Sequence, residues 1–246
     1  MADRTEPFVY SGNELELFAA AVNWKAYWSS QILPYLGNDV LELGAGLGAT
    51  ARTLNHKPYR CWLGLEPDQA MCDTVRARQG PDMPAGYQIR HGTSADLAPD
   101  ERFDTVLYID VLEHIEDDRA ELERACAHLV PGGHLIIVAP AHNRLYSDFD
   151  KKVGHHRRYD KPMLRAIVPA PLNVRQLHYL DSVGMLASLL NRLVLKSDSP
   201  SPAQIRLWDS IMVRASRWVD VLTGHRLGKS IVCILEKPRT DGTASS

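Results

Sequence analysis

The stretch DVLELGAGLGAT, residues 39–50, decides the fold. It predicts an apolar strand, then a turn that contains three glycines, then a helix that continues to about Leu54. Glycines at 44, 46 and 48 permit a tight turn and let a ligand approach the backbone, while the start of the following helix offers free N–H groups. The stretch therefore predicts a ligand-binding turn at the end of the first strand of an α/β sheet.

Strand and helix patterns alternate on the carboxyl-terminal side of this turn. Further apolar runs begin at Cys61, Tyr87, Phe103 and His134. Helices are expected over residues 68–79 and 117–130. The second of these helices is expected to end at Pro131, because Gly132 and Gly133 follow as stop signals. Strands that alternate with helices form parallel sheets with right-handed crossovers, so we expect a doubly wound α/β sheet through Pro140.

Helical patterns flank this core on both sides. Residues 13–36 have the apolar spacing of one or two helices, and a mostly helical stretch from about 183 to 222 precedes the last apolar run, KSIVCILEK. This arrangement predicts a core decorated by a late helical cap. The expected regions are an N-terminal helical segment over the ligand site (1–37), the core (38–182), the helical insertion (183–226), the last core strand (227–237) and a disordered tail (238–246).

Composition narrows the class of protein and of partner. The 246 residues suit one domain with an appendage, and 28 basic against 30 acidic residues predict no general attraction to nucleic acid or anionic lipid. The four cysteines form no CxxC pair, which predicts reduced thiols in a cytoplasmic protein. The segment MLASLLNRLVL, residues 185–195, is too short to span a bilayer, and the first ten residues have no secretory apolar core.

The glycine turn alone fits two classes of cofactor. Gly44, Gly46 and Ala49 match the GxGxxG/A pattern of NAD-binding folds, and Glu66 lies near the spacing of their ribose-binding acid. Glu42 argues against that alternative, because its carboxylate would repel a pyrophosphate and would suit the cationic end of a ligand. A persuasive hydride-transfer group, such as a Tyr-x-x-x-Lys pair on a helix, is also missing from the sequence.

Five ordered motifs resemble those of the class I S-adenosylmethionine-dependent methyltransferases. ELGAGLG is similar to the family's acidic-x-Gly-x-Gly-x-Gly motif, LGLEPD to the end of its second strand, and HGTSADL to its adenine-flanking segment. FDTVLYIDVLEHIED and LVPGGHLIIVAP resemble its fourth-strand and fifth-strand motifs. The resemblance covers roughly residues 38–140, and KSIVCILEK fits the family's seventh strand. It implies a seven-stranded Rossmann-like sheet, with S-adenosylmethionine as methyl donor and S-adenosylhomocysteine as product.

The resemblance also implies a set of cofactor-binding residues. Glu66 is expected to hold both ribose hydroxyls through charge-assisted hydrogen bonds, and Glu42 to serve the cationic end of the cofactor. For Asp96, a plain surface carboxylate is an open alternative. The expected set is Glu42, Gly44, Ala45, Gly46, Gly48, Glu66, Pro67, Thr93, Ser94, Asp96, Ile109 and Asp110.

The methyl acceptor should approach over the carboxyl ends of the strands. A hydroxyl acceptor needs a base, and the candidates are His114, His155 and His156, although His114 could instead cap or pack the helix that follows. Adjacent histidines in a loop do not have the spacing of a recognised metal site, so no metal is expected. The candidate substrate-binding residues are Tyr10, Trp24, Tyr27, Glu113, Arg157, Arg158 and Tyr159.

The basic loop VGHHRRYDKPML, residues 153–164, follows the fifth strand. Arg157 or Arg158 could anchor an acceptor carboxylate or phosphate, with Tyr159 as a wall. The alternative is that at least one arginine pairs with an aspartate of the same segment and fixes the loop, because charges in a cleft need partners. The aspartates within reach are Asp148, Asp150 and Asp160.

In the insertion, apolar residues from Trp208 to Leu222 follow helical spacing, with three arginines among them. This predicts a helix packed on its own domain or on a second subunit, with a lid or a peripheral membrane contact as alternatives.

Taken together, these features predict a cytoplasmic methyltransferase that is monomeric or homodimeric. Its expected acceptor is an oxygen, or alternatively a nitrogen, of a small metabolite, and an amphipathic metabolite is one option. No nucleic-acid partner is expected. The alternative function is an NAD-dependent oxidoreductase that uses the same glycine turn.

Overall fold

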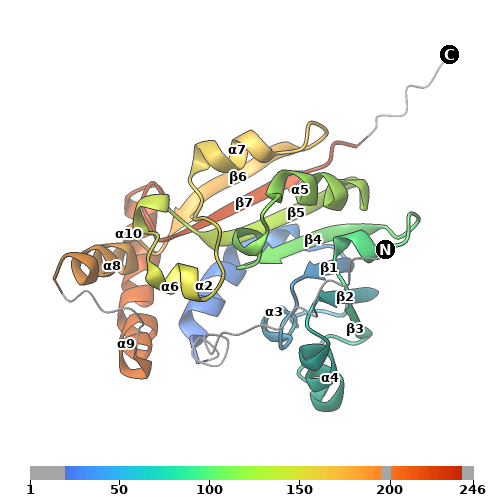
Figure 1. Cartoon of the computed structure of the whole chain (residues 1–246), viewed down its shortest axis with the longest axis horizontal. Coiled ribbons are helices and arrows are strands. Elements are labelled where there is room, and N and C mark those ends of the chain that lie inside the picture. The colour runs from blue at the N-terminus through green and yellow to red at the C-terminus, as the bar shows by residue number, and fades with distance from the viewer. Residues whose placement is uncertain (1–19, 195–200, 240–246) are drawn as a thin grey trace, which may run out of the picture.

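In the computed structural model, which describes residues 20–194 and 201–239, seven strands form one mixed sheet between two layers of helices (Figure 1). The strand order is β3-β2-β1-β4-β5-β7-β6, and β7 pairs antiparallel with both of its neighbours. The doubly wound, seven-stranded sheet expected from the sequence is thereby confirmed. The strands are β1 (Asp39–Leu43), β2 (Cys61–Glu66), β3 (Tyr87–His91), β4 (Phe103–Ile109), β5 (Leu129–Pro140), β6 (Asn173–Leu180) and β7 (Ser230–Glu236).

Each face of the sheet has its own apolar core, because successive side chains of a strand point to opposite faces. On β5, Ile136 and Val138 belong to the cluster under α2, α3, α4 and α10, whereas Leu135 and Ile137 belong to the cluster under α5 and α7. Figure 1 shows α5 and α7 on one side of the sheet and α2 and α3 on the other. The helices are α2 (Val22–Ile32), α3 (Ala49–Thr53), α4 (Gln69–Arg78), α5 (Asp118–Ala127), α6 (Asp148–Lys152), α7 (Lys161–Ile167), α8 (Ser182–Val194), α9 (Pro202–Leu207) and α10 (Val213–Leu222).

Aspartate side chains begin three of the core helices. Asp68, Asp117 and Asp160 each accept a hydrogen bond from a backbone N–H in the first turn of α4, α5 and α7, respectively. Such caps satisfy donors that the helix itself leaves free. They explain why these helices start directly after the loops at the carboxyl ends of strands, where the functional groups lie.

The predicted helix over 117–130 is wrong at its carboxyl end. Helix α5 stops at Ala127, and β5 begins at Leu129, which pairs with Phe103. Gly132 and Gly133 do not stop a helix here but exchange backbone hydrogen bonds with Lys237, next to β7. Pairing with distant segments therefore outweighs the local stop signal, and Pro131 is tolerated near the start of the strand.

The apolar spacing predicted for the last helix does not mark its buried face. Ile211, Trp218 and Leu222 are 60%, 79% and 85% exposed. The side of α10 that faces the domain carries Val213, Ser216 and Asp220 instead, all fully buried. A π-helical turn, Trp208–Met212, joins α9 to α10 and changes the register of the side chains between them.

Buried carboxylates attach these last helices to the rest of the domain. Asp220 accepts hydrogen bonds from the Tyr27 hydroxyl and from the backbone N–H groups of Asp181 and Ser182. Asp209 accepts hydrogen bonds from the backbone N–H groups of Asn23 and Trp24 in α2. The polar network, rather than an apolar stripe, determines which face of α10 turns inward. Among the helices of the described ranges, none combines the length and the apolar character needed to cross a membrane.

Candidate functional site

The carboxyl ends of β1, β2 and β4 bring the predicted cofactor residues to one edge of the sheet. The glycine turn follows β1, Glu66 ends β2, and Asp110 follows β4. Because β1 pairs in parallel with both β2 and β4, these three ends are neighbours. In open α/β sheets, ligands bind at this edge, beside the strand where the order reverses.

The glycine turn needs its glycines for backbone conformation. Gly44, Gly46 and Gly48 all have left-handed φ angles, of 64°, 53° and 76°. A Cβ on Gly44 would in addition lie 2.6 Å from a methyl carbon of Val111, in the segment after β4. The turn therefore packs against the neighbouring strand end and keeps its backbone open on the other side. Ala45 is buried, and its N–H donates to the Leu65 carbonyl.

Glu66 stabilises the glycine turn, and its carboxylate can still accept hydrogen bonds from a ligand. One carboxylate oxygen accepts a hydrogen bond from the Gly46 N–H at 2.8 Å, and the other accepts one from the Asp68 N–H at 2.9 Å. Burial raises the pKa of this carboxyl, and the two backbone hydrogen bonds oppose that rise. Two carboxylate oxygens offer about four acceptor sites, so room remains for a ribose diol.

Glu42 lies beneath the glycine turn rather than in the open cleft. It is 2% exposed, and its carboxylate accepts a hydrogen bond from the Trp62 indole N–H at 2.9 Å. Burial raises its pKa to about 7, although hydrogen bonds from Trp62 and Thr50 act in the opposite direction. Thr50 lies in α3, directly after the turn, so Glu42 links the turn to the core.

The segment after β3 is organised by its own side chains. Asp96 is exposed and accepts hydrogen bonds from the N–H and the hydroxyl of Thr93. Ser94 is buried and donates to Glu121 of α5 at 2.7 Å. The backbone carbonyl of Pro67, the residue directly after β2, accepts a hydrogen bond from the imidazole of His91. The predicted adenine segment thus lies beside Glu66, with Asp96 in the position of a surface capping residue.

The end of β4 has a constrained backbone. Ile109 is the last residue of the strand, and Asp110 has a left-handed φ of 53°, which few residues other than glycine adopt. Its N–H donates to the Val138 carbonyl of β5. Desolvation of its carboxyl group by the surrounding protein raises the pKa of Asp110 to about 6. The nearby His155 and Lys229 oppose this rise. Such strain concentrates at functional sites.

Glu113, His114 and His155 form a compact group next to this strand end. Glu113 and His114 lie in the short 3₁₀ helix Leu112–His114, and His155 comes from the loop after α6. One potential ligand atom from each residue lies within 4.8 Å of the other two. The rings of the two histidines meet edge to face, with centroids 4.6 Å apart. Burial, followed by the neighbouring His155, lowers the pKa of His114 to about 4.

Asp150 orients the loop that carries His155. Its carboxylate is fully buried and pairs in a bidentate manner with Arg158, at 2.8 and 2.9 Å, while His155 Nδ1 lies 2.9 Å from the same carboxylate. Burial alone would raise the pKa of Asp150, but the hydrogen bonds from His155 and Arg158 hold it well below its usual range. Arg158 is therefore a loop-fixing residue, as the alternative drawn from the sequence proposed.

Arg157 and Tyr159 are also bonded within the protein. Arg157 pairs with Asp118 at 2.5 Å and donates to the Glu116 carbonyl. The Tyr159 hydroxyl donates to the same Asp118 carboxylate at 2.8 Å, and the residue is 1% exposed. The structure thus buries Tyr159 instead of presenting it as a wall of an open site. Asp118 was not among the predicted site residues, and its only sequence signal is its place in the first turn of the helix after His114.

The side chains of the remaining candidates do not belong to this group. Trp24 and Tyr27 are buried in the contact between α2 and the last helices, where Trp24 packs on Trp208 and Tyr27 bonds Asp220. His156 is exposed, and its backbone N–H donates to the Glu113 carbonyl. Tyr10 lies outside the described residues. The structure thus brings together Glu113, His114 and His155 of the predicted acceptor side.

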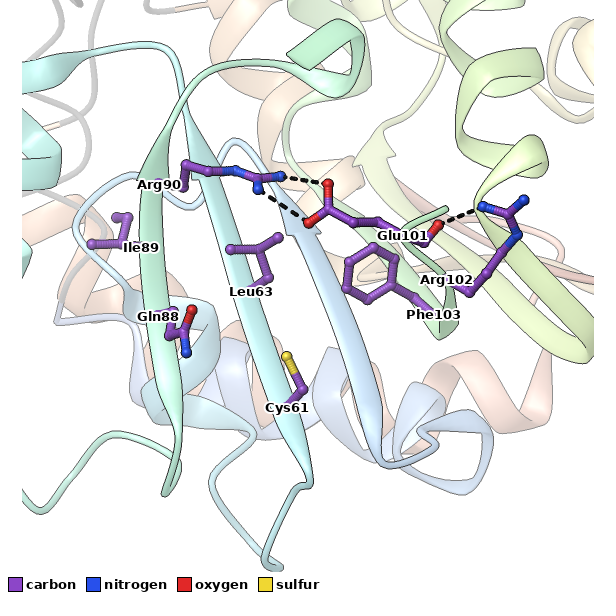
Figure 2. Close-up of a pocket in the computed structure, with 8 residues that line it drawn as sticks. All are labelled: Cys61, Leu63, Gln88, Ile89, Arg90, Glu101, Arg102 and Phe103. Atoms are coloured by element: carbon purple, nitrogen blue, oxygen red, sulfur yellow. Dashed lines mark hydrogen bonds and ion pairs between the residues drawn. The ribbon is translucent and has the colours of Figure 1, made fainter. Parts of the chain in front are cut away.

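A pocket of about 320 Å³ lies elsewhere, on the face of β2, β3 and β4 (Figure 2). Figure 2 shows Arg90 paired with Glu101 through two hydrogen bonds, of 3.0 and 3.1 Å. Cys61 and Phe103, which line it, are the first residues of β2 and β4, so the pocket lies toward the opposite ends of these strands from the glycine turn. This internal ion pair accounts for two of its charged groups, and the third, Arg102, donates to the backbone carbonyls of Pro99 and Glu101.

Comparisons with known proteins agree on the type of domain. A family model described as a methyltransferase domain matches residues 25–197, more than two thirds of the chain. A probable S-adenosylmethionine-dependent methyltransferase of Mycolicibacterium smegmatis is 35% identical over 105 residues, which make up 42% of this chain and 38% of that protein. A ubiquinone biosynthesis O-methyltransferase of Paramagnetospirillum magneticum is 30% identical over 105 residues, 42% of this chain and 41% of that protein.

The matches to these curated relatives span only about two fifths of the relatives' own length. Over nearly the whole chain, the fold is similar to that of an S-adenosylmethionine-dependent methyltransferase of Mesorhizobium loti. That solved structure has a TM-score of 0.58 at 17% identity, and the match covers 88% of this chain and 98% of the other. At this identity the likeness concerns the fold alone.

Proposed function

The chain belongs to the class I S-adenosylmethionine-dependent methyltransferase family, and on that premise we propose that it methylates a hydroxyl oxygen of a small, amphipathic metabolite. The observation that carries the proposal is the position of the group of Glu113, His114 and His155. It lies at the same edge of the sheet as the glycine turn and Glu66. Donor and acceptor groups at one edge allow direct, in-line transfer.

The residues at the glycine turn suit the family's methyl donor. Glu66 has unused acceptor sites for a ribose diol, and the three left-handed glycines leave their own backbone uncovered by side chains. Glu42 is buried beneath the turn, so it would act on a cationic ligand through its charge at a distance and not through a direct hydrogen bond. When bound, S-adenosylmethionine supplies an electrophilic methyl group on a sulfonium. The turn and Glu66 fix its position, and the expected adenine segment flanks it.

A hydroxyl acceptor must lose its proton as the new bond forms. His155 is the best-placed base, because its Nδ1 is bonded to Asp150 and its Nε2 side lies toward Glu113, 3.9 Å away. His114, next to it, is a neutral imidazole at physiological pH. The transfer converts the hydroxyl to a methyl ether, releases S-adenosylhomocysteine and leaves one proton for the base or for water. A nitrogen acceptor would need no comparable base.

The last helices support an amphipathic acceptor. Their exposed apolar side chains, called here the α9–α10 apolar face, are Leu207, Ile211, Trp218, Val221 and Leu222. The exposed charged residues of α9 and α10 are all arginines, Arg206, Arg214 and Arg217, because Asp209 and Asp220 are buried in hydrogen bonds. Apolar side chains flanked by arginines fit an anionic lipid surface, and we assign this face to a peripheral contact with one. A ubiquinone biosynthesis enzyme among the relatives points to the same class of acceptor.

The NAD-dependent alternative is not retained, because the family that matches the chain is one of methyltransferases. A cytoplasmic location remains our proposal. The four free thiols, three of them buried, suit a reducing compartment.

The proposal is tested by methyl transfer from S-adenosylmethionine with a labelled methyl group. Candidate acceptors are first selected by their effect on thermal unfolding in the presence of S-adenosylhomocysteine, across hydroxylated, carboxylated and lipid-like compounds. We expect label to enter a hydroxylated amphiphile as a methyl ether, and a His155→Ala variant to lose at least about 100-fold in kcat. Transfer to amines only would contradict the proposed acceptor atom.

A further inference from the structure

Glu113 is a buried carboxyl group that the protein does not satisfy. It is 0% exposed, and neither of its carboxylate oxygens forms a hydrogen bond with another residue of the described ranges. Such a group is costly unless it is protonated or paired with a cation. His155 lies close to it, with Nε2 3.9 Å from Oε1, and the charge of Asp110 also acts on this carboxyl.

His155 is oriented as a metal-binding histidine would be. Its Nδ1 lies 2.9 Å from the buried carboxylate of Asp150, which fixes the ring and leaves Nε2 directed toward Glu113. Asp150 in turn accepts hydrogen bonds from Nε and Nη2 of the Arg158 guanidinium. A carboxylate that accepts a hydrogen bond from the second ring nitrogen is the usual support of a histidine ligand.

His114 completes the group from the other side. Its ring meets His155 at an interplanar angle of 86°, and it also has a hydrogen bond with the backbone of Gly154. One nitrogen or oxygen from each of the three residues lies within 4.8 Å of the others. Ligand atoms about 2.1 Å from a tetrahedral ion are roughly 3.4 Å apart, so small side-chain rotations would close the site.

We propose that Glu113, His114 and His155 bind one divalent first-row transition-metal ion, with Asp150 as the positioning residue for His155. One carboxylate and two imidazoles suit Zn²⁺, Co²⁺ or Fe²⁺, whereas Mg²⁺ and Ca²⁺ prefer oxygen ligands. The sequence did not predict this site. Its ligands are Glu113 and His114, adjacent in one short helix, and a histidine 41 residues later, brought together by the loop after α6.

Three protein ligands leave an open position on such an ion. If the proposed function holds, that position would take the acceptor oxygen. A bound hydroxyl loses its proton more readily than a free one, because the cation stabilises the resulting oxyanion. With its Nε2 bound to the ion, His155 would position the metal instead of acting as the base. The proton would pass to water, and the oxygen would then accept the methyl group as S-adenosylhomocysteine is released. Metal binding itself does not depend on this role.

The test is calorimetric titration of the metal-free protein with Zn²⁺, and with Co²⁺ followed by its visible absorption. We expect one equivalent to bind to the wild-type protein. Affinity should fall at least about 100-fold in Glu113→Gln and in His155→Ala. The matched control is His156→Ala, the adjacent and exposed histidine, which should bind metal like the wild type.

A second measurement needs no variant. Wild-type protein loaded with one equivalent of Cu²⁺ should show electron paramagnetic resonance coupling to two imidazole nitrogens. Absence of stoichiometric binding, equal affinity in all variants, or a spectrum without histidine nitrogens would each overturn the metal site. Titration of the metal-free protein with S-adenosylhomocysteine separates the two ideas. If that ligand binds while added Zn²⁺ does not, the metal site is wrong and the donor site on which the proposed function rests stands.

Discussion

At the scale of single residues, Glu66 connects the glycine turn of the donor site to the start of α4. Its carboxylate bonds the N–H of Gly46 in the glycine turn and the N–H of Asp68 at the start of α4. The same oxygens are expected to hold the ribose diol. A change at this position therefore acts both on the ligand and on the shape of the turn.

We predict that Glu66→Gln weakens binding of S-adenosylhomocysteine by about 100-fold, because hydrogen bonds to a charged acceptor contribute roughly 1.5–3 kcal/mol each. The measurement is calorimetric titration at pH 7.5. Glu101→Gln is the matched control, since Glu101 pairs with Arg90 at the distant pocket and should leave the affinity unchanged. Equal affinities for all three proteins would remove Glu66 from the donor site.

Glu42 makes stability depend on pH. Its pKa of about 7 in the folded protein lies above the ordinary value of 4.5. Between these two pH values the unfolded chain releases this proton while the folded chain retains it, so rising pH favours unfolding. The free energy of unfolding of Glu42→Gln, relative to wild type, should therefore rise by about 3 kcal/mol between pH 4.5 and pH 7.5. Urea unfolding across that range measures the difference, and a difference that stays constant with pH would contradict the assignment.

At the scale of elements, the loop that carries His155 depends on a buried ion pair. Arg158, in the loop after α6, binds Asp150 within that helix, and Asp150 is also the capping partner of Ser147. By contrast, Asp148 and Lys151 form a pair on the exposed side of the same helix. The two pairs allow a comparison within one element.

Arg158→Ala should lower the free energy of unfolding by about 3–5 kcal/mol, because it leaves a buried carboxylate with fewer partners. Lys151→Ala should lower it by less than about 1 kcal/mol, since its ion pair is exposed to water. Urea unfolding at neutral pH provides both values. Similar losses in the two variants would show that Asp150 and Arg158 do not hold the loop.

At the scale of the whole molecule, the α9–α10 apolar face is expected to meet an anionic bilayer. Replacing Trp218 and Leu222 together by serine should weaken binding to phosphatidylglycerol-containing vesicles at least about 10-fold, because each buried apolar side chain contributes roughly 1.5–3 kcal/mol. Sedimentation with vesicles measures this, and added salt should weaken the wild-type contact. Val174→Ser, an exposed valine on β6, is the control. Binding by wild type and the double variant to the same extent would contradict the assignment.

The sheet and the donor turn could be predicted from sequence because their signals are local. Each signal is contained in a stretch of a few residues: the apolar run of each strand, the glycines directly after β1, and the acid that ends β2. The acceptor side could not be predicted as well, because its contacts join distant segments. Tyr159 bonds Asp118, 41 residues away, and Trp24 bonds Asp209, 185 residues away. No local pattern shows that these pairings bury the two aromatic residues.

The same reason explains why the apolar spacing of the last helix does not lie on the side that packs on its own domain. Trp218 and Leu222 are exposed, because the hydrogen bonds of Asp209 and Asp220 turn the opposite face inward. Buried carboxylates stabilise a helix face only if their partners are in place, and those partners come from α2 and from the start of α8.

Calorimetric titration of the wild-type protein with S-adenosylmethionine and, separately, with NAD⁺ tests most directly which cofactor the glycine turn binds. The spacing of its glycines is compatible with either ligand. We expect one equivalent of S-adenosylmethionine to bind with a Kd of about 1–100 μM, and NAD⁺ to give no measurable heat. Saturable binding of NAD⁺ without binding of S-adenosylmethionine would contradict this expectation.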